Sequence, residues 1–251
     1  MKYFLVFVIL TVTFSSCEKD KTPPPLFEKS QETFQAVSRS EISPYIDGKP
    51  TDPAWKKIAW IPLDNTWQGD NITYAAQYKL TWTPDALFIL LAIENEQLKR
   101  TFNNPLSTFK DQNRVIVYLD ENNSGGDHAA NHSAFAYQIL SDGFIIDYNA
   151  ENKPTIYNNH IDSELSKTDS KLYWEIKVTV FKESYCDNQP NEAVKLSVDK
   201  KLGFALAYVS VDSLEKTKTT NTIIGSMPIP EDYENRIATD SGLFGTILLS
   251  N

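Results

Sequence analysis

Short runs of alternating apolar and polar residues dominate this chain and limit the folds that are open to it. Residues 72–83 (ITYAAQYKLTWT) place Tyr78, Leu80 and Trp82 on one face. Because successive side chains in a strand point to opposite faces, this spacing predicts a β-strand with an apolar face. Residues 172–181 (LYWEIKVTVF) follow the same pattern. Further strands are predicted over residues 87–93, 114–119, 134–140, 144–148, 202–211 and 243–249.

Turn residues join several of these runs into hairpins. Pro84-Asp85-Ala86 and Ser141-Asp142-Gly143 each separate two predicted strands. Asp52 followed by Pro53 predicts one short helix, with Asp52 as the N-cap and Pro53 as the first helical residue. Strands do not alternate with long helices anywhere in the sequence. We therefore expect an all-β fold, a two-sheet antiparallel β-sandwich with one short helix near the start.

The beginning of the chain has the features of a secretory signal. The apolar run over residues 3–14 follows Lys2 and is shorter than the ~20 residues that span a bilayer. Small residues then precede Cys17, an arrangement that resembles a bacterial lipobox. We expect residues 1–16 to be removed and Cys17 to carry a lipid that anchors the protein, in the outer membrane. The alternative is an ordinary signal followed by an unmodified cysteine.

The segment after the expected anchor favours a spacer. Three consecutive prolines from Pro23 stand among charged and polar residues, and such prolines favour extended polyproline II. We expect a lipidated N-terminus and Pro-rich tether over residues 17–44 and one folded domain over residues 45–251. Only Cys186 remains besides Cys17, so the fold is not expected to depend on a disulfide.

The charge balance argues against a nucleic-acid partner. The 33 Asp and Glu exceed the 24 Lys and Arg, which gives a formal net charge of −9. Basic residues do not gather in clusters, whereas proteins that bind nucleic acid carry basic patches. We therefore expect no nucleic acid as partner, and contact with a membrane only through the lipid.

Several segments together resemble family 9 carbohydrate-binding modules. Asp47, Gly48, Asp52 and Trp55 resemble the D-G-x-x-D-x-x-W opening of that family, with one extra spacer residue. Later segments resemble its hairpin, its Asp-Asn loop and its closing strands, in family order, over residues 78–93, 115–126, 174–180, 202–212 and 243–249. The resemblance implies a β-sandwich that binds sugar, with Trp55 as a structural residue.

The resemblance also implies a biological setting. We expect non-catalytic binding of plant-type polysaccharide or its oligosaccharides at the cell envelope, in support of carbohydrate catabolism and beside a glycoside hydrolase. No Ser-His-Asp arrangement, G-x-S-x-G motif or phosphate loop is present, and no cofactor is required. Two other classes stay open. One is an envelope module that binds a protein or has a structural role, and the less favoured one is a glycoside hydrolase.

Trp67 is the main candidate for contact with a sugar ring. It stands in a polar segment, residues 64–69 (DNTWQG), outside the predicted strands. The apolar face of a sugar can stack on an indole, and Asn65 and Gln68 can bind its hydroxyls. The alternative is that Trp67 is a buried plug beneath this segment, since Trp is highly buried on average. Weaker candidates are Asn113, Arg114, Tyr137 and, as the second aromatic residue, Tyr233.

A metal site is the other candidate. Asp120, Asn122 and Asp127 offer oxygen ligands on a glycine-containing loop, and calcium binds six to eight such oxygens. The resemblance implies that this calcium is structural; the alternative is a solvated acidic turn. His128 and His132 have the spacing of zinc ligands on a helix, but no third ligand can be assigned, so we expect a polar loop there.

Overall fold

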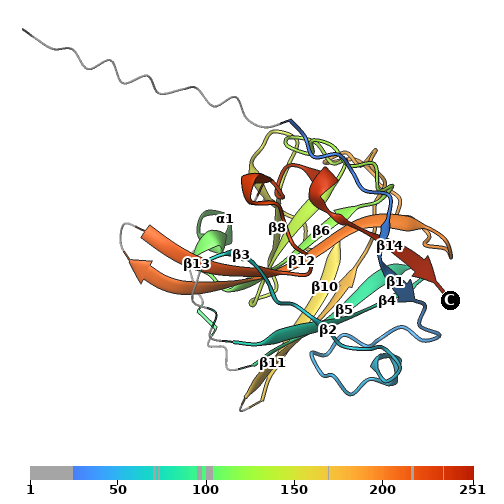
Figure 1. Cartoon of the computed structure of the whole chain (residues 1–251), viewed down its shortest axis with the longest axis horizontal. Coiled ribbons are helices and arrows are strands. Elements are labelled where there is room, and N and C mark those ends of the chain that lie inside the picture. Colours follow the sequence, from blue (N-terminus) through green and yellow to red (C-terminus); the bar gives the residue numbers. More distant parts are fainter. Residues whose placement is uncertain are drawn as a thin grey trace, which may run out of the picture.

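Two β-sheets pack face to face in the computed structural model, as Figure 1 shows. The structure describes residues 25–69, 72, 74–94, 98, 99, 104–168, 170–215, 218–233 and 235–251. Every strand pairing in this part of the chain is antiparallel except that of β1 with β14. The predicted all-β sandwich is confirmed, with one parallel pair added to it.

The larger sheet contains nine of the described strands and the smaller sheet five. The larger sheet has the order β1 (Thr33–Ser38), β14 (Gly245–Ser250), β12 (Lys201–Glu215), β6 (Arg114–Asp120), β7 (Phe135–Leu140), β8 (Ile145–Tyr148) and β9 (Pro154–Ile156), while β13 (Lys218–Gly225) pairs with β12 and β3 (Asn65–Gln68) pairs with β13. The smaller sheet has the order β10 (Ile161–Lys167), β11 (Lys171–Val178), β5 (Ala86–Glu94), β4 (Ala76–Thr83) and β2 (Ile61–Pro62).

The main core lies between the two sheets. Tyr78, Leu80 and Trp82 of β4 and Trp174 of β11 are buried there, on the faces that their alternation predicted. The central strand β5 is apolar on both sides because it is covered on both sides: Leu87, Ile89, Leu91 and Ile93 face the main core, and Ala86, Phe88 and Leu90 face a second cluster. Burial of such side chains contributes roughly 1.5–3 kcal/mol each.

The predicted tether joins the fold earlier than expected. Within residues 17–44, Thr33–Ser38 forms β1 and pairs with the last strand, β14. Upstream of it, the Phe27 N–H donates to Asp240 Oδ2 at 2.9 Å, and Thr246 Oγ1 donates to the Ser30 carbonyl at 2.7 Å. The prediction of a spacer up to residue 44 is therefore wrong, because only Val37 of this strand is buried, so the segment lacks the apolar face that marks the other strands. The expected signal and Cys17 lie outside the described residues.

One short helix forms where the sequence predicted it. The Asp52 side chain accepts from Ala54 N at 2.8 Å and caps η1 (Pro53–Trp55). This 3-10 helix ends at Trp55, whose carbonyl accepts from Ile58 N and from Lys79 Nζ instead of continuing an α-helix. The other described helices are α1 (Pro105–Thr108), η2 (Phe109–Asp111), η3 (Glu231–Tyr233) and η4 (Ser241–Leu243). Among the described residues, no helix has the length and apolar character that crossing a bilayer requires.

A buried carboxylate fixes the segment that covers the outer face of the smaller sheet. Glu175 of β11 is 0% exposed. Its Oε2 accepts from the backbone N–H groups of Asp47 and Gly48 at 2.9 and 2.8 Å, and its Oε1 accepts from Trp55 Nε1 at 2.7 Å. Burial raises the pKa of Glu175, and these three donors counteract that rise. The Asp-Gly and Trp positions of the opening motif therefore meet on one side chain.

We expect Glu175→Gln to lower the free energy of unfolding by about 1–3 kcal/mol, because an amide NH₂ placed here leaves buried donors without an acceptor. Chemical denaturation of both proteins measures this difference. The matched control is Glu164→Gln, because Glu164 pairs with Glu175 in the β10–β11 register but is exposed. Its expected effect is within about 0.5 kcal/mol. Equal effects of the two substitutions would contradict the role assigned to Glu175.

Candidate functional site

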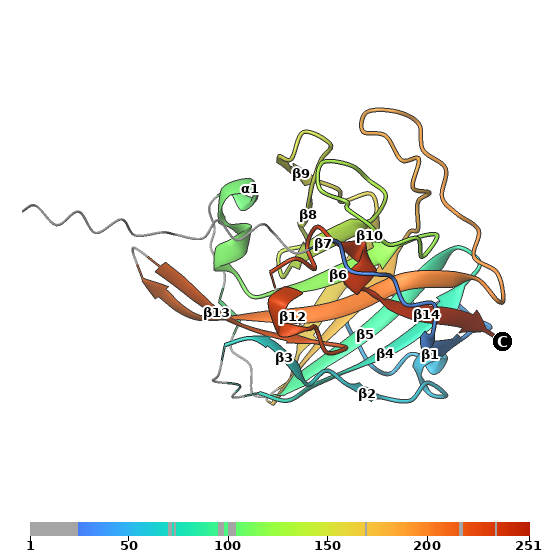
Figure 2. The same ribbon diagram turned by 45° about the horizontal axis from the view of Figure 1, so that its top comes forward.

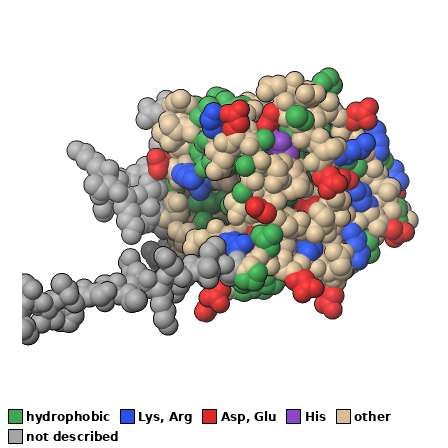
Figure 3. Space-filling model, turned by 90° about the horizontal axis from the view of Figure 1, so that it is seen from above, with side chains coloured by type: hydrophobic (Ala, Val, Ile, Leu, Met, Phe, Trp, Pro, Cys, Tyr) green, Lys and Arg blue, Asp and Glu red, His purple; other side chains and the backbone are tan. Residues whose placement is uncertain are grey.

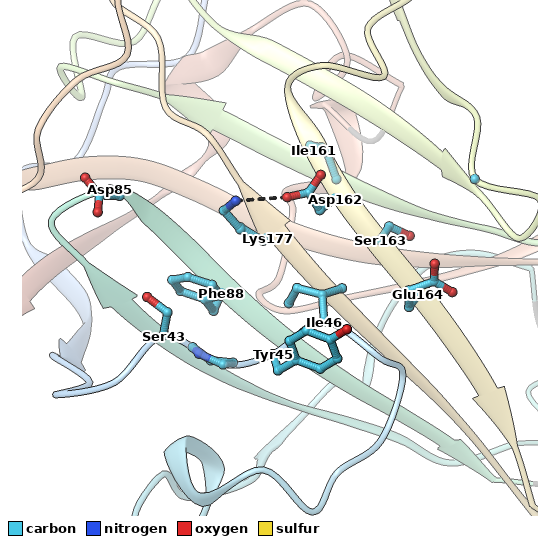
Figure 4. Close-up of a pocket in the computed structure, with 12 residues that line it drawn as sticks. Ser43, Tyr45, Ile46, Asp85, Phe88, Ile161, Asp162, Ser163, Glu164 and Lys177 are labelled. Carbon is cyan, nitrogen blue, oxygen red and sulfur yellow. Dashed lines mark hydrogen bonds and ion pairs between the residues drawn. The ribbon is translucent and has the colours of Figure 1, made fainter.

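An open groove runs along the smaller sheet, between residues 43–46 and strand β10. Its volume is about 730 Å³. Figure 4 shows the Tyr45 ring and Ser43 below the groove, with the side chains of β10 and β11 above them. The polar and aromatic residues that line it are Ser43, Tyr45, Asp85, Phe88, Asp162, Ser163, Glu164 and Lys177. The site thus combines one exposed aromatic ring, that of Tyr45, with hydroxyl, carboxylate and ammonium groups.

The Tyr45 ring is exposed although its backbone is fixed. Its side chain is 75% exposed, the largest exposure among the large hydrophobic residues of the described chain. The Tyr45 N–H donates to Asp52 Oδ2 at 3.1 Å, and the next residue, Ile46, packs on the cluster around Trp55. The hydrogen bonds that Glu175 accepts from the backbone N–H groups of Asp47 and Gly48 also fix this segment. The fold therefore presents an aromatic face to solvent without leaving its backbone free.

Strands β10 and β11 form the opposite wall of the groove. Asp162 and Lys177 are register partners, and their side chains form an ion pair with 2.9 Å between Nζ and Oδ2. Ser163 Oγ accepts from Trp174 Nε1 at 2.9 Å, which leaves the Ser163 hydroxyl hydrogen free to donate. Alternation along β10 brings Asp162 and Glu164 to the same face. The wall offers both donors and acceptors to a ligand that carries many hydroxyls.

This arrangement has the features of a site for a polyhydroxylated ligand. Such a ligand has apolar C–H faces that can lie on the Tyr45 ring and hydroxyls that need paired donors and acceptors. Binding sites in general combine an apolar or aromatic surface with a few placed polar groups. A groove open to solvent can also accept a chain longer than one ring. The chemistry that the groove supplies is recognition by contact and hydrogen bonding.

Trp67 lies elsewhere, and the hypothesis that it presents an open face to a sugar is wrong. It is 5% exposed, and its Nε1 donates to the Met227 carbonyl at 2.6 Å. Its indole lies flat on Gly225, where an added Cβ would come within 2.0 Å of the ring. The reason is that residues 65–68 form strand β3 on the edge of the larger sheet, so Trp67 points into the apolar cluster over that sheet.

The neighbours expected to assist Trp67 have no open ring to assist, and one of them is bound to the fold. Asn65 Nδ2 donates to the Gly225 carbonyl at 3.3 Å, and Gln68 is exposed on β3. Tyr233 packs against the same cluster as Trp67, with the Phe27 ring edge-on at 5.2 Å between centroids. Trp67 and Tyr233 therefore belong to one packed layer and do not form a cleft for a sugar ring.

The other three predicted residues lie inside the sandwich or at a strand end. Asn113 is fully buried and its Nδ2 donates to Tyr208 Oη at 2.9 Å. Tyr137 is fully buried, and its hydroxyl is 2.9 Å from His160 Nδ1. Arg114 donates to Gln138 Oε1 and to two backbone carbonyls, and burial lowers its pKa to about 10. The structure does not bring Asn113, Arg114 or Tyr137 into the groove.

The three predicted calcium ligands do not converge. Asp120 accepts from the N–H groups of its own loop and faces Lys29, whose ammonium also donates to the Phe244 carbonyl. Burial lowers the pKa of Lys29 to about 8, and the Asp120 charge opposes that shift. Asn122 binds Glu183 at 2.6 Å, and Asp127 caps the backbone of Ala129. Lys29 supplies positive charge at the buried Asp120 carboxylate.

The two histidines of the possible zinc pair face different parts of the molecule. His128 packs on Phe244, and burial lowers its pKa to about 4. His132 Nε2 lies 2.8 Å from Asp187 Oδ2, in the long loop between β11 and β12 that Figure 2 shows in orange at upper right. Tyr157 also donates to Asp187, at 2.8 Å. In the described part of the chain, no group of three or more His, Cys, Asp or Glu side chains is placed to hold a metal.

Sequence reasoning missed the residues of the groove. Tyr45 stands two residues before the Asp-Gly motif, at the predicted domain boundary, where nothing marks it as part of a site. Strand β10 (IDSELSK) was not predicted, although its alternation of Ile161, Ser163 and Leu165 with acidic residues is a strand signal. Only the pairing of β10 with β11 and the return of residues 43–46 bring these groups together.

The surface carries charges of both signs. On the face shown in Figure 3, Lys and Arg side chains lie among Asp and Glu side chains, without a continuous basic stripe on that face. Some charges of the described surface form exposed ion pairs, such as Lys153 with Glu151. Such pairs contribute little to stability.

Comparison with known proteins relates the chain to sugar-binding domains. A family model described as carbohydrate family 9 binding domain-like matches residues 46–251. Family 9 carbohydrate-binding modules from Caldicellulosiruptor kristjanssonii are similar in structure. The complex with glucose has a TM-score of 0.60 and 18% identity, covering 86% of this chain and 96% of that one. The complex with cellotriose has a TM-score of 0.58 and 17% identity, covering 86% of this chain and 94% of that one.

A proposed carbohydrate-binding protein from Bacteroides uniformis is also similar, with a TM-score of 0.56 and 10% identity, over 86% of this chain and 99% of that one. No curated protein is significantly similar in sequence. At such identities the structural similarity shows only a shared fold. The assignment of the chain to a family rests on the family model.

We expect Trp67→Ala to lower the free energy of unfolding by about 3–5 kcal/mol, because it removes a buried indole and leaves a cavity. Denaturation measures this loss. For the fraction that stays folded, calorimetric affinity for sugar should be unchanged. Tyr45→Ala is the control, with an expected stability change within about 0.5 kcal/mol. Loss of sugar affinity with unchanged stability on replacing Trp67 would restore its role as a sugar-stacking residue.

Proposed function

The chain belongs to the carbohydrate family 9 binding domain-like family, and from this membership we propose that it binds oligo- or polysaccharide in the groove beside Tyr45 without cleaving it. The observation that carries the proposal is the exposed Tyr45 ring over an open groove lined by hydroxyl and charged groups. A buried aromatic such as Trp67 cannot offer a face to a ligand, whereas a ring that is 75% exposed can.

The distribution of carboxyl groups favours binding over hydrolysis. Glycosidases use a pair of carboxyls that flank the scissile bond, and the general acid of the pair has a raised pKa. Among the described residues, burial raises the pKa of the Asp120, Asp147 and Glu175 carboxyls, that of Asp147 to about 7. Each accepts backbone N–H bonds, and none lines the groove. In the groove, Asp162 is engaged by Lys177.

The proposed ligand class is a neutral plant-type glycan. Glucose and cellotriose are the ligands of the two similar modules, and cellotriose is a linear neutral oligosaccharide. The groove supports the same class of ligand here. Two of its carboxylates, Asp162 and Asp85, form ion pairs with Lys177 and Lys195, and the groove is open to solvent, which suits a chain with many hydroxyls. A glycoside hydrolase that acts on the bound polysaccharide is the proposed partner, and the function is a contribution to carbohydrate catabolism.

The proposed location is the outer membrane of the cell envelope, with a lipid on Cys17. The support is the apolar run over residues 3–14, the small residues before Cys17, and the prolines that follow it. Pro25 is bound to the domain, since Arg236 donates to its carbonyl at 2.9 Å. The domain would therefore stand close to the membrane that holds it.

We expect Tyr45→Ala to weaken sugar binding about 5- to 150-fold, which corresponds to the loss of about 1–3 kcal/mol of stacking, by analogy with bases on aromatic rings. A glycan array identifies the ligand, and calorimetry with cello- and xylo-oligosaccharides measures the affinity. Tyr45→Phe is the matched control, because it keeps the ring and should keep most of the affinity. Unchanged binding in Tyr45→Ala, or no glycan bound by the parent protein, would contradict the proposal.

We expect Cys17→Ala to release the protein from the membrane fraction, because the lipid-bearing sulfur is lost. Fractionation of cells that express either form, with immunoblotting, tests this. Cys186→Ala controls for the loss of a thiol at an exposed position of the fold. If the Cys17→Ala protein stays in the membrane fraction as the parent does, the anchor is not at Cys17.

A further inference from the structure

A second hollow adjoins the groove at the edge strand β10. It has a volume of about 210 Å³ and lies between the turn of the β7–β8 hairpin, residues 141–143, and residues 163–165 of β10. Gly143, Ser163 and Glu164 line both this hollow and the larger groove. The two spaces are therefore neighbours that share one wall, and Glu164 stands at their junction.

The junction between the two hollows is open because of the hairpin turn. Gly143 closes the turn with a φ of +87°, and its N–H donates to the Leu140 carbonyl at 3.0 Å. A Cβ added there would meet no atom within 4 Å. On the other side of the junction, Ser163 is oriented by its bond from Trp174 Nε1. A chain that leaves the Tyr45 end of the groove thus meets oriented polar groups and no obstruction at the turn.

The charge of the junction limits what can lie across it. Asp162 is paired with Lys177, and Asp85, at the other end of the groove, is paired with Lys195. Glu164 is exposed and has no ion-pair partner among the residues that the structure describes. An unpaired carboxylate accepts hydrogen bonds from hydroxyls and repels another anion. The junction therefore suits hydroxyls and disfavours carboxylate or sulfate groups.

We infer that the two hollows form one binding surface for a linear, uncharged glycan of more than one sugar unit, and that Glu164 makes this surface select against acidic glycans. The inference rests on the proposed function and adds which residues set the length and charge of the ligand, Gly143 by leaving the turn open and Glu164 by its unpaired carboxylate. The expected consequence is that affinity grows with chain length within a neutral series and falls when the same chain carries uronic acids.

Calorimetry on the full chain, in a detergent without sugar groups, tests both parts. The probes are glucose, cellobiose, cellotriose and cellotetraose, with xylo-oligosaccharides as a second neutral series and oligogalacturonides as the acidic one. We expect the tetrasaccharide to bind at least about tenfold more tightly than glucose, equivalent to about 1.4 kcal/mol. Oligogalacturonides should bind at least about tenfold more weakly than neutral chains of equal length. Added salt should reduce this difference in affinity between neutral and acidic chains, because it screens the charge of the exposed Glu164 carboxylate.

Two variants separate the contribution of the open turn at Gly143 from that of the Glu164 carboxylate. Gly143→Asn places a side chain in the junction, and Asn tolerates positive φ better than most residues, so the tetrasaccharide should lose its advantage in affinity over glucose. Glu164→Gln keeps a carbonyl acceptor and should narrow the gap between neutral and acidic chains. Glu151→Gln removes the same charge outside the groove and should leave the gap unchanged. Thermal melts establish that each variant is folded.

Each result decides a different claim. Equal affinity of the parent protein for glucose and for the tetrasaccharide would overturn the continuous surface and leave the proposed function standing. Equal affinity for neutral and acidic chains, or a gap that Glu164→Gln does not change, would overturn the role of Glu164. Failure to bind any neutral sugar would instead contradict the proposed function itself.

Discussion

The buried Glu175 carboxylate is the interaction on which the arrangement of the site depends. A carboxylate out of water is costly unless donors surround it, and here the N–H groups of Asp47 and Gly48 and the Trp55 indole do so. The same bonds hold residues 43–58 against the outer face of the smaller sheet, where Phe88 and Leu90 are buried beneath them. Without this covering segment the sheet would expose an apolar face, and Tyr45 would have no fixed position beside β10.

The larger sheet is covered by the N-terminal and C-terminal segments together. Phe27 packs edge-on against Tyr233, and Lys29 reaches the Phe244 carbonyl beside Asp120. The apolar cluster beneath them includes Trp67, which explains why this Trp serves packing. Both sheets therefore bury much of their outer faces, and the groove lies where the covering segment 43–46 stops short of the edge strand β10.

Acidic side chains have two separate uses in this molecule. Asp120, Asp147 and Glu175 are buried and accept backbone N–H bonds, so they fix loops and strand ends. Asp162 and Glu164 stand on the outer face of β10, where solvent and a ligand can reach them. The first group has raised pKa values because burial disfavours the charge, and its members have no access to a ligand in the groove. Of these carboxylates, only those of Asp162 and Glu164 can contact a ligand in the groove.

The sequence by itself determined the all-β sandwich, its two hairpins and the capped turn at Asp52, because alternation, turn residues and caps are local properties of the chain. The opening motif was also visible, but its purpose was not, since its acceptor, Glu175, is 120 residues from Trp55. Tertiary structure alone decided that Trp67 is buried on Gly225 while Tyr45 is exposed. Exposure of an aromatic ring depends on which distant strand covers it, and residues 43–46 and β10 become neighbours only when the sheets have paired.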